Sequence, residues 1–251
     1  MLDILQGMIV AFAMYSKIPM PGINWTKNNM KYAICFFPMI GAVIGLVMLG
    51  WFYLAEQIGM GQIFRTSVAV LIPVMITGGI HLDGLLDTAD ALSSYKSREE
   101  RLEILKDSHA GAFAIIVGIS YFVLQFGVYS ELTFEKMKVL ALGFVVSRSL
   151  SGLALVSFRK AKNTGLLRTF SDASANRRVA VVLTGYLLVI AAGLLMIQWK
   201  RALVMLAAAL LTFVWYRSMS YRIFGGITGD LAGFFLQIAE LAMALGVALM
   251  C

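Results

Sequence analysis

The sequence predicts an all-α integral membrane protein: a helical bundle with about seven transmembrane helices (five to seven) and an additional N-terminal helix at the membrane interface. Hydrophobic residues make up 60% of the 251 residues and charged residues only 14%, whereas soluble domains are about half apolar and a quarter charged. The apolar residues also form runs near the ~20 residues that span a bilayer core. Despite a net charge of +7, this composition excludes a soluble globule, a disordered chain and a nucleic-acid-binding protein.

The first sixteen residues predict an amphipathic helix that lies in the membrane interface. They lack the basic start of a secretory signal, contain Asp3, and have an apolar run too short to cross the bilayer. Their apolar residues recur at helical spacing: Leu2, Leu5, Ile9 and Phe12. The turn at 18–22, which contains two prolines and a glycine, ends this helix.

Seven later segments are apolar enough to be transmembrane helices. They are 33–54, 66–82, 112–130, 138–157, 179–198, 202–217 and 231–250. The second and sixth are short, and the sixth could instead pair with the fifth as a re-entrant hairpin, which would leave five full spans. Because no linker or low-complexity tract divides the chain, we expect residues 1–251 to form a single integral-membrane domain.

Lysine and arginine residues are distributed unevenly between these segments. Fifteen lie on the side of the N-terminus and five on the opposite side, and cytoplasmic loops carry the excess of positive charge. We therefore expect an inner (plasma) membrane protein whose N-terminal side faces the cytoplasm. The loops 83–111, 158–178 and 217–230 would share that face.

The strongest local motif is acidic. Asp83, Asp87 and Asp90 are spaced i, i+4, i+7, which places them within an arc of about 60° on one helical face. Carboxylates that close repel one another unless a cation neutralises them, and oxygen ligands together with substrate phosphates suit Mg²⁺. We expect Gly84 to let a ligand approach the backbone. The alternative is a solvated acidic helix end, but the flanking leucines favour a partly buried helix.

Asp107 and the two histidines lie near this motif. Asp107 could be a general base or a further metal ligand, although it could equally be the N-cap of the helix that follows. His81 and His109 flank the acidic stretch, and either a catalytic or a hydrogen-bonded structural role is open to them.

Two ionisable residues lie inside predicted spans. Arg148 and Glu240 are each about midway along their segment, and an ionisable group at that depth indicates function by default. They could also pair as a buried structural salt bridge, so both interpretations stay open.

Two loops could bind phosphate. The glycine-rich stretch 225–230 could present backbone N–H groups to a phosphate, or it could simply begin a helix with Asp230 as N-cap. The basic loop 158–178 fits positive-inside topology and anionic lipid, and it also suits an anionic, phosphorylated substrate.

The motif from Gly79 to Asp90 resembles the signature of the cobalamin synthase family, the adenosylcobinamide-GDP ribazoletransferases. Further stretches are similar to that family in the same order: Ile18-Pro19 with Pro21, Lys106-Asp107-Ser108 with Gly111-Ala112-Phe113, Ser147-Arg148, and Gly226-Ile227-Thr228-Gly229-Asp230 with Gly233 and Glu240. The stretch 161–166 resembles an Ala-Arg-x-x-Gly-Leu element in which Lys162 replaces the arginine. The resemblance covers nearly the whole chain.

This resemblance implies a Mg²⁺-dependent transferase of the last steps of cobalamin (vitamin B12) biosynthesis. It would join α-ribazole, or its 5′-phosphate, to adenosylcobinamide-GDP and release GMP. The implied metal ligands are Asp83, Asp87 and Asp90, with His81 or Asp107 as the base. The implied substrate-binding residues are Arg148, Lys162, Gly229, Asp230 and Glu240. A homo-oligomer, or association with other cobalamin-assembly enzymes, stays open.

Other classes of membrane protein use spaced aspartates. A CDP-alcohol phosphotransferase would have an Ala-Arg pair after Asp-Gly, and a polyprenyl transferase would have two Asp-rich motifs; the sequence has neither. A cation transporter using Asp83, Asp87, Asp90 and Glu240 would spread its carboxylates across the membrane. Because all of these carboxylates except Glu240 lie together at one end of the predicted spans, the sequence favours catalysis on a substrate at the membrane surface.

Overall fold

A computed structural model describes residues 2–107, 109–161 and 166–250, and this part of the chain is helical without any β-strand. The fold class predicted from the sequence is confirmed. In chain order the elements are α1 (Leu2–Tyr15), α2 (Lys27–Met30), the 3₁₀-helix η1 (Ala33–Phe36), α3 (Phe37–Gln57), α4 (Gln62–Thr77), α5 (Ile80–Ser93), α6 (Arg98–Ile104), α7 (Ala112–Ser130), α8 (Phe134–Ser157), α9 (Leu166–Ala173), α10 (Asn176–Met219), the π-helix η2 (Ser220–Phe224) and α11 (Gly229–Ala248).

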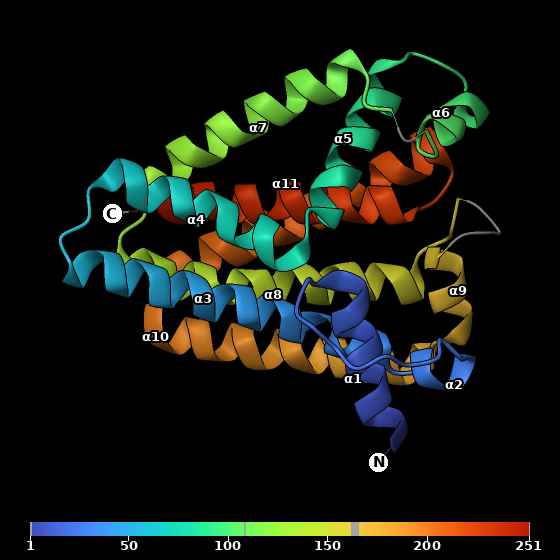
Figure 1. The fold of residues 1–251 in the computed structure, drawn as a ribbon, viewed down its shortest axis with the longest axis horizontal. Helices are drawn as coiled ribbons and strands as arrows, with labels where there is room; N and C mark the ends of the chain where they lie inside the picture. Colours follow the sequence, from blue (N-terminus) through green and yellow to red (C-terminus); the bar gives the residue numbers. More distant parts are fainter. Residues whose placement is uncertain (1, 108, 162–165, 251) are drawn as a thin grey trace.

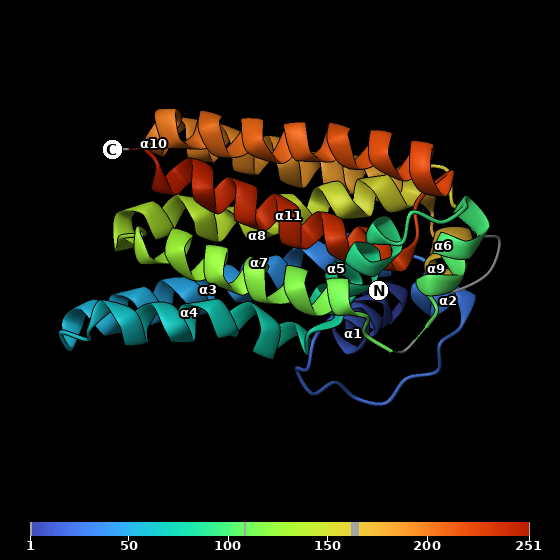
Figure 2. The ribbon, with the colours of Figure 1, turned by 90° about the horizontal axis from the view of Figure 1, so that it is seen from above.

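Helix α8 is the centre of the bundle. In its most apolar stretch 83% of the residues are buried, against 11% for α10. Helices α3, α10 and α11 pack along it (Figures 1 and 2). Gly41 and Gly45 of α3 allow the closest of these approaches, because a Cβ at either position would clash with the backbone of α8 at Phe144 or Ala141.

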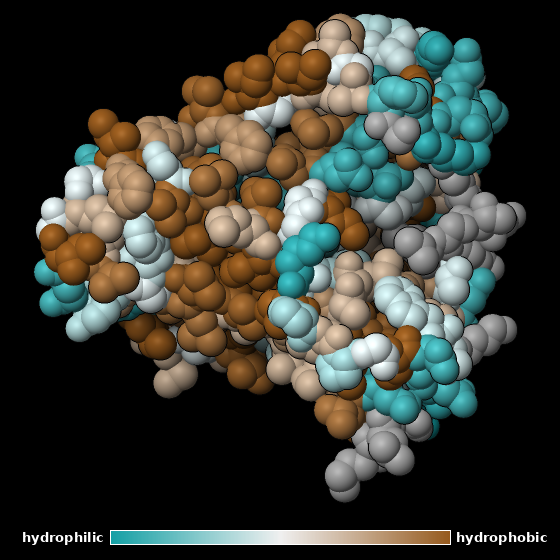
Figure 3. Space-filling model, in the orientation of Figure 1, coloured by the Kyte–Doolittle hydropathy of each residue, from teal (hydrophilic) through white to brown (hydrophobic). Residues whose placement is uncertain are grey.

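Within the described residues, five helices are long and apolar enough to cross a membrane, or six if the bent pair of α4 and α5 forms one span. These numbers lie within the predicted range. Figure 3 shows one face of this surface: hydrophobic side chains cover much of its middle, and the largest group of hydrophilic ones lies at the end where α6 lies.

The predicted span 66–82 is wrong at its C-terminal end. Helix α4 stops at Thr77, and α5 leaves it at an angle of 95°. Gly78 and Gly79 produce this bend, since both adopt positive φ values (67° and 80°) that are accessible to glycine at little cost. The bend turns α5 across the end of the bundle, where it packs against α11 and α7 (Figure 1). It thereby separates the acidic motif from the span.

Helix α10 contains both of the predicted segments 179–198 and 202–217. Its backbone is helical except at Gln198, and a straight helix of that length would be about 66 Å long. Instead both of its ends lie near the C-terminal end of α8, because Leu183 packs on Gly152 while Tyr216 packs on Phe158. The chain therefore reverses at Gln198 and forms a helical hairpin (Figure 1).

The predicted N-terminal helix is confirmed as α1, but its buried face differs from the expected one. Val10, Ala11 and Phe12 are buried, whereas Leu5, one of the expected apolar positions, is 52% exposed. Helix α1 packs against η1 and α3. Its buried residues therefore contact the rest of the protein, which helical spacing alone could not reveal.

The three loops expected on one face do lie at one end of the bundle. The described residues of 158–178 are joined to the glycine-rich stretch: the amide of Ala161 donates to Ile227 O at 3.0 Å, and Arg159 Nε donates to Gly225 O at 2.8 Å. Arg98, from the loop region that follows the acidic motif, packs against Gly225. Residues 162–165, including Lys162, lie outside the described residues.

Candidate active site

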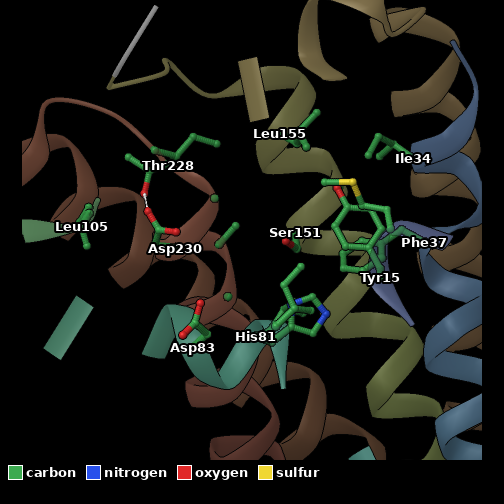
Figure 4. Close-up of a pocket in the computed structure, with 18 of the residues that line it drawn as sticks. Tyr15, Ile34, Phe37, His81, Asp83, Leu105, Ser151, Leu155, Thr228 and Asp230 are labelled. Carbon is green, nitrogen blue, oxygen red and sulfur yellow. Dashed lines mark hydrogen bonds between the residues drawn. The ribbon is translucent and has the colours of Figure 1, made fainter. Parts of the chain in front are cut away.

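A cavity of about 330 Å³ opens at this polar end of the bundle. Helices α1, α3, α5, α8 and α11 and the loop after α6 contribute its walls (Figure 4). The residues that line it include Tyr15, Ile34, Phe37, His81, Asp83, Lys106, Ser151, Leu155, Thr228, Gly229 and Asp230. Four of the residues predicted to form the site, His81, Asp83, Gly229 and Asp230, line this cavity.

The two sequence motifs meet at Gly84. A Cβ on this residue would lie 2.5 Å from Asp230 O and 3.1 Å from Asp230 Cα, so the missing side chain lets the start of α11 pack directly on α5. The expectation that Gly84 admits a ligand is therefore wrong: the backbone of Asp230 occupies that space. This contact places the carboxylates of Asp83 and Asp230 on the same side of the cavity (Figure 4).

Negative charge is concentrated behind these two carboxylates. Burial raises the pKa of Asp87 to about 6, and the nearby charges of Asp83, Asp230, Asp90 and Asp107 add to that rise. Among the residues that the structure describes, however, no three histidine, cysteine or carboxylate side chains are already placed to hold a metal ion. A cation at this site would therefore need additional oxygen ligands from a substrate.

Asp90 has a different partner from its two neighbours in the motif. Its carboxylate accepts hydrogen bonds from the backbone N–H of Gly111 at 2.5 Å and of Ala114 at 2.9 Å. These are donors at the first turn of α7, which has no partner for them within the helix. Asp90 thus caps α7 from a different helix, and both of its oxygens are engaged in doing so.

Asp107 is not the N-cap of α7, because that position belongs to Gly111. Its carboxylate instead accepts hydrogen bonds from His109, from the ring Nδ1 at 2.7 Å and from the amide at 3.0 Å. These two bonds hold the pKa of Asp107 below its usual range. A carboxyl with a lowered pKa is a weaker base, and burial likewise lowers the pKa of the His81 ring, so these shifts do not rank one residue above the other as proton acceptor.

His81 is buried on the cavity wall beside two aromatic rings. Its ring centroid lies 6.2 Å from that of Tyr15 and 5.7 Å from that of Phe37. Its Nε2 has no hydrogen-bond partner among the described residues, although buried polar atoms are nearly always paired. The residue lines the cavity, but Nε2 itself is shielded from solvent, so a ligand in the cavity would meet this nitrogen only after a shift of the ring or its neighbours.

The glycine-rich stretch begins α11, but Thr228 rather than Asp230 is its N-cap. Thr228 Oγ1 accepts from the amide of Leu231 at 3.2 Å. The amides of Gly226 and Ile227 donate within the protein, to Ser220 O and Arg159 O. Because those two N–H groups are engaged, they are not available to cradle a phosphate, whereas Asp230 is released from capping and lines the cavity.

Arg148 and Glu240 form a buried ion pair. Arg148 Nη1 lies 2.7 Å from Glu240 Oε1, and the two residues are 1% and 4% exposed. Ser147 Oγ donates to the same glutamate oxygen at 2.8 Å, and Phe144 O accepts from Arg148. Neither charged side chain lines the cavity. The geometry favours the structural interpretation over the substrate-binding one.

The apolar wall of the cavity carries no sequence motif. Tyr15, Ile34, Phe37 and Leu155 come from α1, η1, α3 and α8, and Ser151 lies among them one turn before Leu155. In the sequence they are ordinary apolar residues of predicted helices. No spacing rule could have distinguished these positions from those that fill the core.

Fold and site together define a polytopic helical membrane protein with an acidic cavity at one polar end. Comparison with known proteins identifies the family: residues 7–248 match the family model described as cobalamin-5-phosphate synthase. The chain belongs to this family, and it is an enzyme.

Relatives match over almost the entire chain. A protein of Lachnoclostridium phytofermentans named adenosylcobinamide-GDP ribazoletransferase is 48% identical over 97% of this chain and 93% of its own length. Proteins with the same name from Clostridium botulinum strain Alaska E43 and from Treponema denticola are 30% and 34% identical, over 96% and 95% of this chain and 96% of each relative. No solved structure matches the chain.

Proposed function

We propose that this enzyme transfers adenosylcobinamide phosphate from adenosylcobinamide-GDP to α-ribazole or its 5′-phosphate, in the last steps of cobalamin biosynthesis. The ribose hydroxyl oxygen bonds to the phosphorus that carries cobinamide, and the bond from that phosphorus to the oxygen of GMP breaks. The observation that carries this proposal is the cavity in which His81 lies beside Asp83 and Asp230, together with the names of the relatives.

The donor set of this cavity fits Mg²⁺. Magnesium in proteins is usually held by one or two carboxylates together with substrate phosphates, and the crowding of aspartates around Asp87 favours a cation. Asp83 on the cavity wall and Asp87, which lies one turn further along α5 and is not part of that wall, would hold the ion, with Asp230 on the same side of the cavity as Asp83. Asp90 could also bind the ion only if its carboxylate does so while accepting the two hydrogen bonds from the first turn of α7. Bound Mg²⁺ would neutralise charge that develops on the phosphate oxygens.

Side chains of the protein would accept the proton and neutralise the charge of the substrate phosphates. His81 is the proposed acceptor for the proton of the ribose hydroxyl, since the residue lines the cavity and its buried Nε2 has no hydrogen-bond partner among the described residues. Lys106 lines the cavity, and its Nζ lies 2.7 Å from Glu103 Oε1 in an exposed ion pair that it would leave in order to offset phosphate charge. Lys162 in the basic loop is a second proposed cation for this role. Arg148 would influence the substrate only by long-range electrostatic interaction, because its guanidinium is paired with Glu240.

We place this cavity on the cytoplasmic side of the inner membrane. The bias of lysine and arginine residues supports that orientation, and it would give soluble substrates direct access to the polar end. The alternative of a cation pathway has less support: among the described residues, Glu240 is the proposed pathway carboxylate deep in the bundle, and it is paired with Arg148.

The direct test is an assay of the purified protein with adenosylcobinamide-GDP, α-ribazole and Mg²⁺. Cobalamin and GMP should appear in equal amounts. Chelation with EDTA should stop turnover, and added Mg²⁺ should restore it. A folded preparation that releases no GMP under these conditions would refute the proposed reaction, while turnover unaffected by EDTA would refute only the metal requirement.

A further inference from the structure

The cavity has two chemically different sides. On one side lie Asp83, Asp230 and Thr228 (Figure 4). The opposite side, here called the apolar wall, consists of Tyr15, Ile34, Phe37, Ser151 and Leu155. His81 lies between the two. The cavity therefore suits an apolar group on one side and a phosphorylated or polar group on the other.

The apolar wall offers a suitable surface for a flat ring. Ile34, Phe37 and Leu155 are buried in the protein, and the rings of Tyr15 and Phe37 lie 4.5 Å apart between centroids. Aromatic and aliphatic walls of this kind bind apolar ligands by burying their surface. The cavity volume of about 330 Å³ is at the lower end of the range for small-molecule sites, roughly 300–1,000 Å³, so it suits a nucleoside and is small for a corrinoid.

The wall carries one hydroxyl besides the phenol of Tyr15. Ser151 is buried, and within the described part of the chain no hydrogen-bond partner is found for its Oγ, which faces the cavity (Figure 4). A ring with a single acceptor nitrogen could pair with this hydroxyl and leave no polar atom unsatisfied.

We propose that the apolar wall binds the benzimidazole base of α-ribazole and that Ser151 Oγ donates a hydrogen bond to the free ring nitrogen of that base. This inference rests on the proposed function. Benzimidazole is flat and apolar apart from that one acceptor. Guanine, the other base among the substrates, presents several donors and acceptors along its edge. Burying them against Ile34, Phe37 and Leu155 would leave most of them unpaired, which costs free energy.

This placement also explains the position of His81. With the base on the apolar wall, the ribose lies between that wall and the acidic side, beside His81 (Figure 4). The wall thus orients the nucleoside so that its hydroxyl meets the proton acceptor and the phosphate beside Asp83 and Asp230.

The test is binding of α-ribazole alone to the purified chain, measured by calorimetry without Mg²⁺ or the second substrate. Leu155→Trp should fill the apolar wall and weaken this binding by about tenfold or more, with little change in the KM for adenosylcobinamide-GDP. Leu211→Trp, at an exposed position of α10, is the matched control and should bind normally. Unchanged binding of α-ribazole by a folded Leu155→Trp protein would overturn the proposal.

Ser151→Ala provides a second test that leaves the volume nearly unchanged. It should weaken binding of α-ribazole by about three- to tenfold, but it should not affect an indole riboside, in which the acceptor nitrogen is replaced by carbon. Equal losses for both ligands would refute the hydrogen bond. If wild-type protein binds α-ribazole through Leu155 and Ser151 yet makes no cobalamin, the proposed reaction fails and the subsite stands. If it makes cobalamin with a KM for α-ribazole insensitive to both substitutions, only the subsite fails.

Discussion

The carboxylate of Asp90 accepts a hydrogen bond of 2.5 Å from the backbone N–H of Gly111, 21 positions further along the chain. A second bond, from Ala114, engages its other oxygen. Asp83, on the same face of α5, lines the cavity. The three aspartates of one helical stripe thus have different surroundings, and they should respond differently to substitution.

Replacing Asp90 with alanine should destabilise the protein. The first turn of α7 would lose the acceptor for two N–H groups, and loss of a helix cap costs about 1 kcal/mol, up to about 2. Thermal unfolding in detergent should show a lower midpoint. Glu56→Ala, at an exposed site near the end of α3, is the control. A midpoint equal to that of wild type would show that the capping bonds contribute nothing to stability.

Asp87→Asn should abolish turnover without unfolding the protein. The substitution keeps the shape of the side chain but removes a charge from the cluster that we propose to hold Mg²⁺. Steady-state release of GMP measures the effect, and Glu99→Gln on the exposed part of α6 should have normal rates. A normal rate for Asp87→Asn would remove this residue from the proposed metal site.

Gly84→Ala should lower both stability and turnover. The new Cβ would lie 2.5 Å from Asp230 O, so α5 and α11 would have to separate, and overpacking of this kind costs about 1–3 kcal/mol. Gly127→Ala in α7 is the matched control, because a Cβ there would meet no neighbouring group within 4 Å and alanine favours a helix. Wild-type unfolding and kinetics for Gly84→Ala would show that this contact does not position the site.

Breaking the Arg148–Glu240 pair should lower the stability of the protein more than it lowers the turnover of the folded enzyme. Removing one partner of a buried ion pair leaves an uncompensated charge and costs about 3–5 kcal/mol. Arg148→Met and Glu240→Met should therefore each unfold at lower temperature or lower denaturant concentration. The double variant should be more stable than either single one, because two apolar residues need no partner.

Turnover decides between the two roles of this pair. If it is structural, the folded double variant should retain substantial activity with KM values near those of wild type. A stable double variant whose KM for adenosylcobinamide-GDP rises sharply would instead support the predicted contact of Arg148 or Glu240 with substrate.

Composition and helical spacing were sufficient to predict the membrane helices, because both depend on local chemistry. The acidic motif, too, could be placed on one face of a helix at one end of the bundle. The segments 179–198 and 202–217 were correctly predicted as separate helices, and Gln198 marks the turn between them. The bend at Gly78 was not predicted, since a pair of glycines permits a sharp turn without requiring one.

The partner of each polar side chain was decided only by the tertiary structure. Spacing places Asp83 and Asp90 on the same stripe, but the packing of α11 and α7 against α5 sends one to the cavity and the other to a helix end. The pairing of Arg148 with Glu240 likewise depends on which helices cross beside α8. Periodicity specifies the face that a residue occupies, whereas long-range packing determines what lies opposite that face.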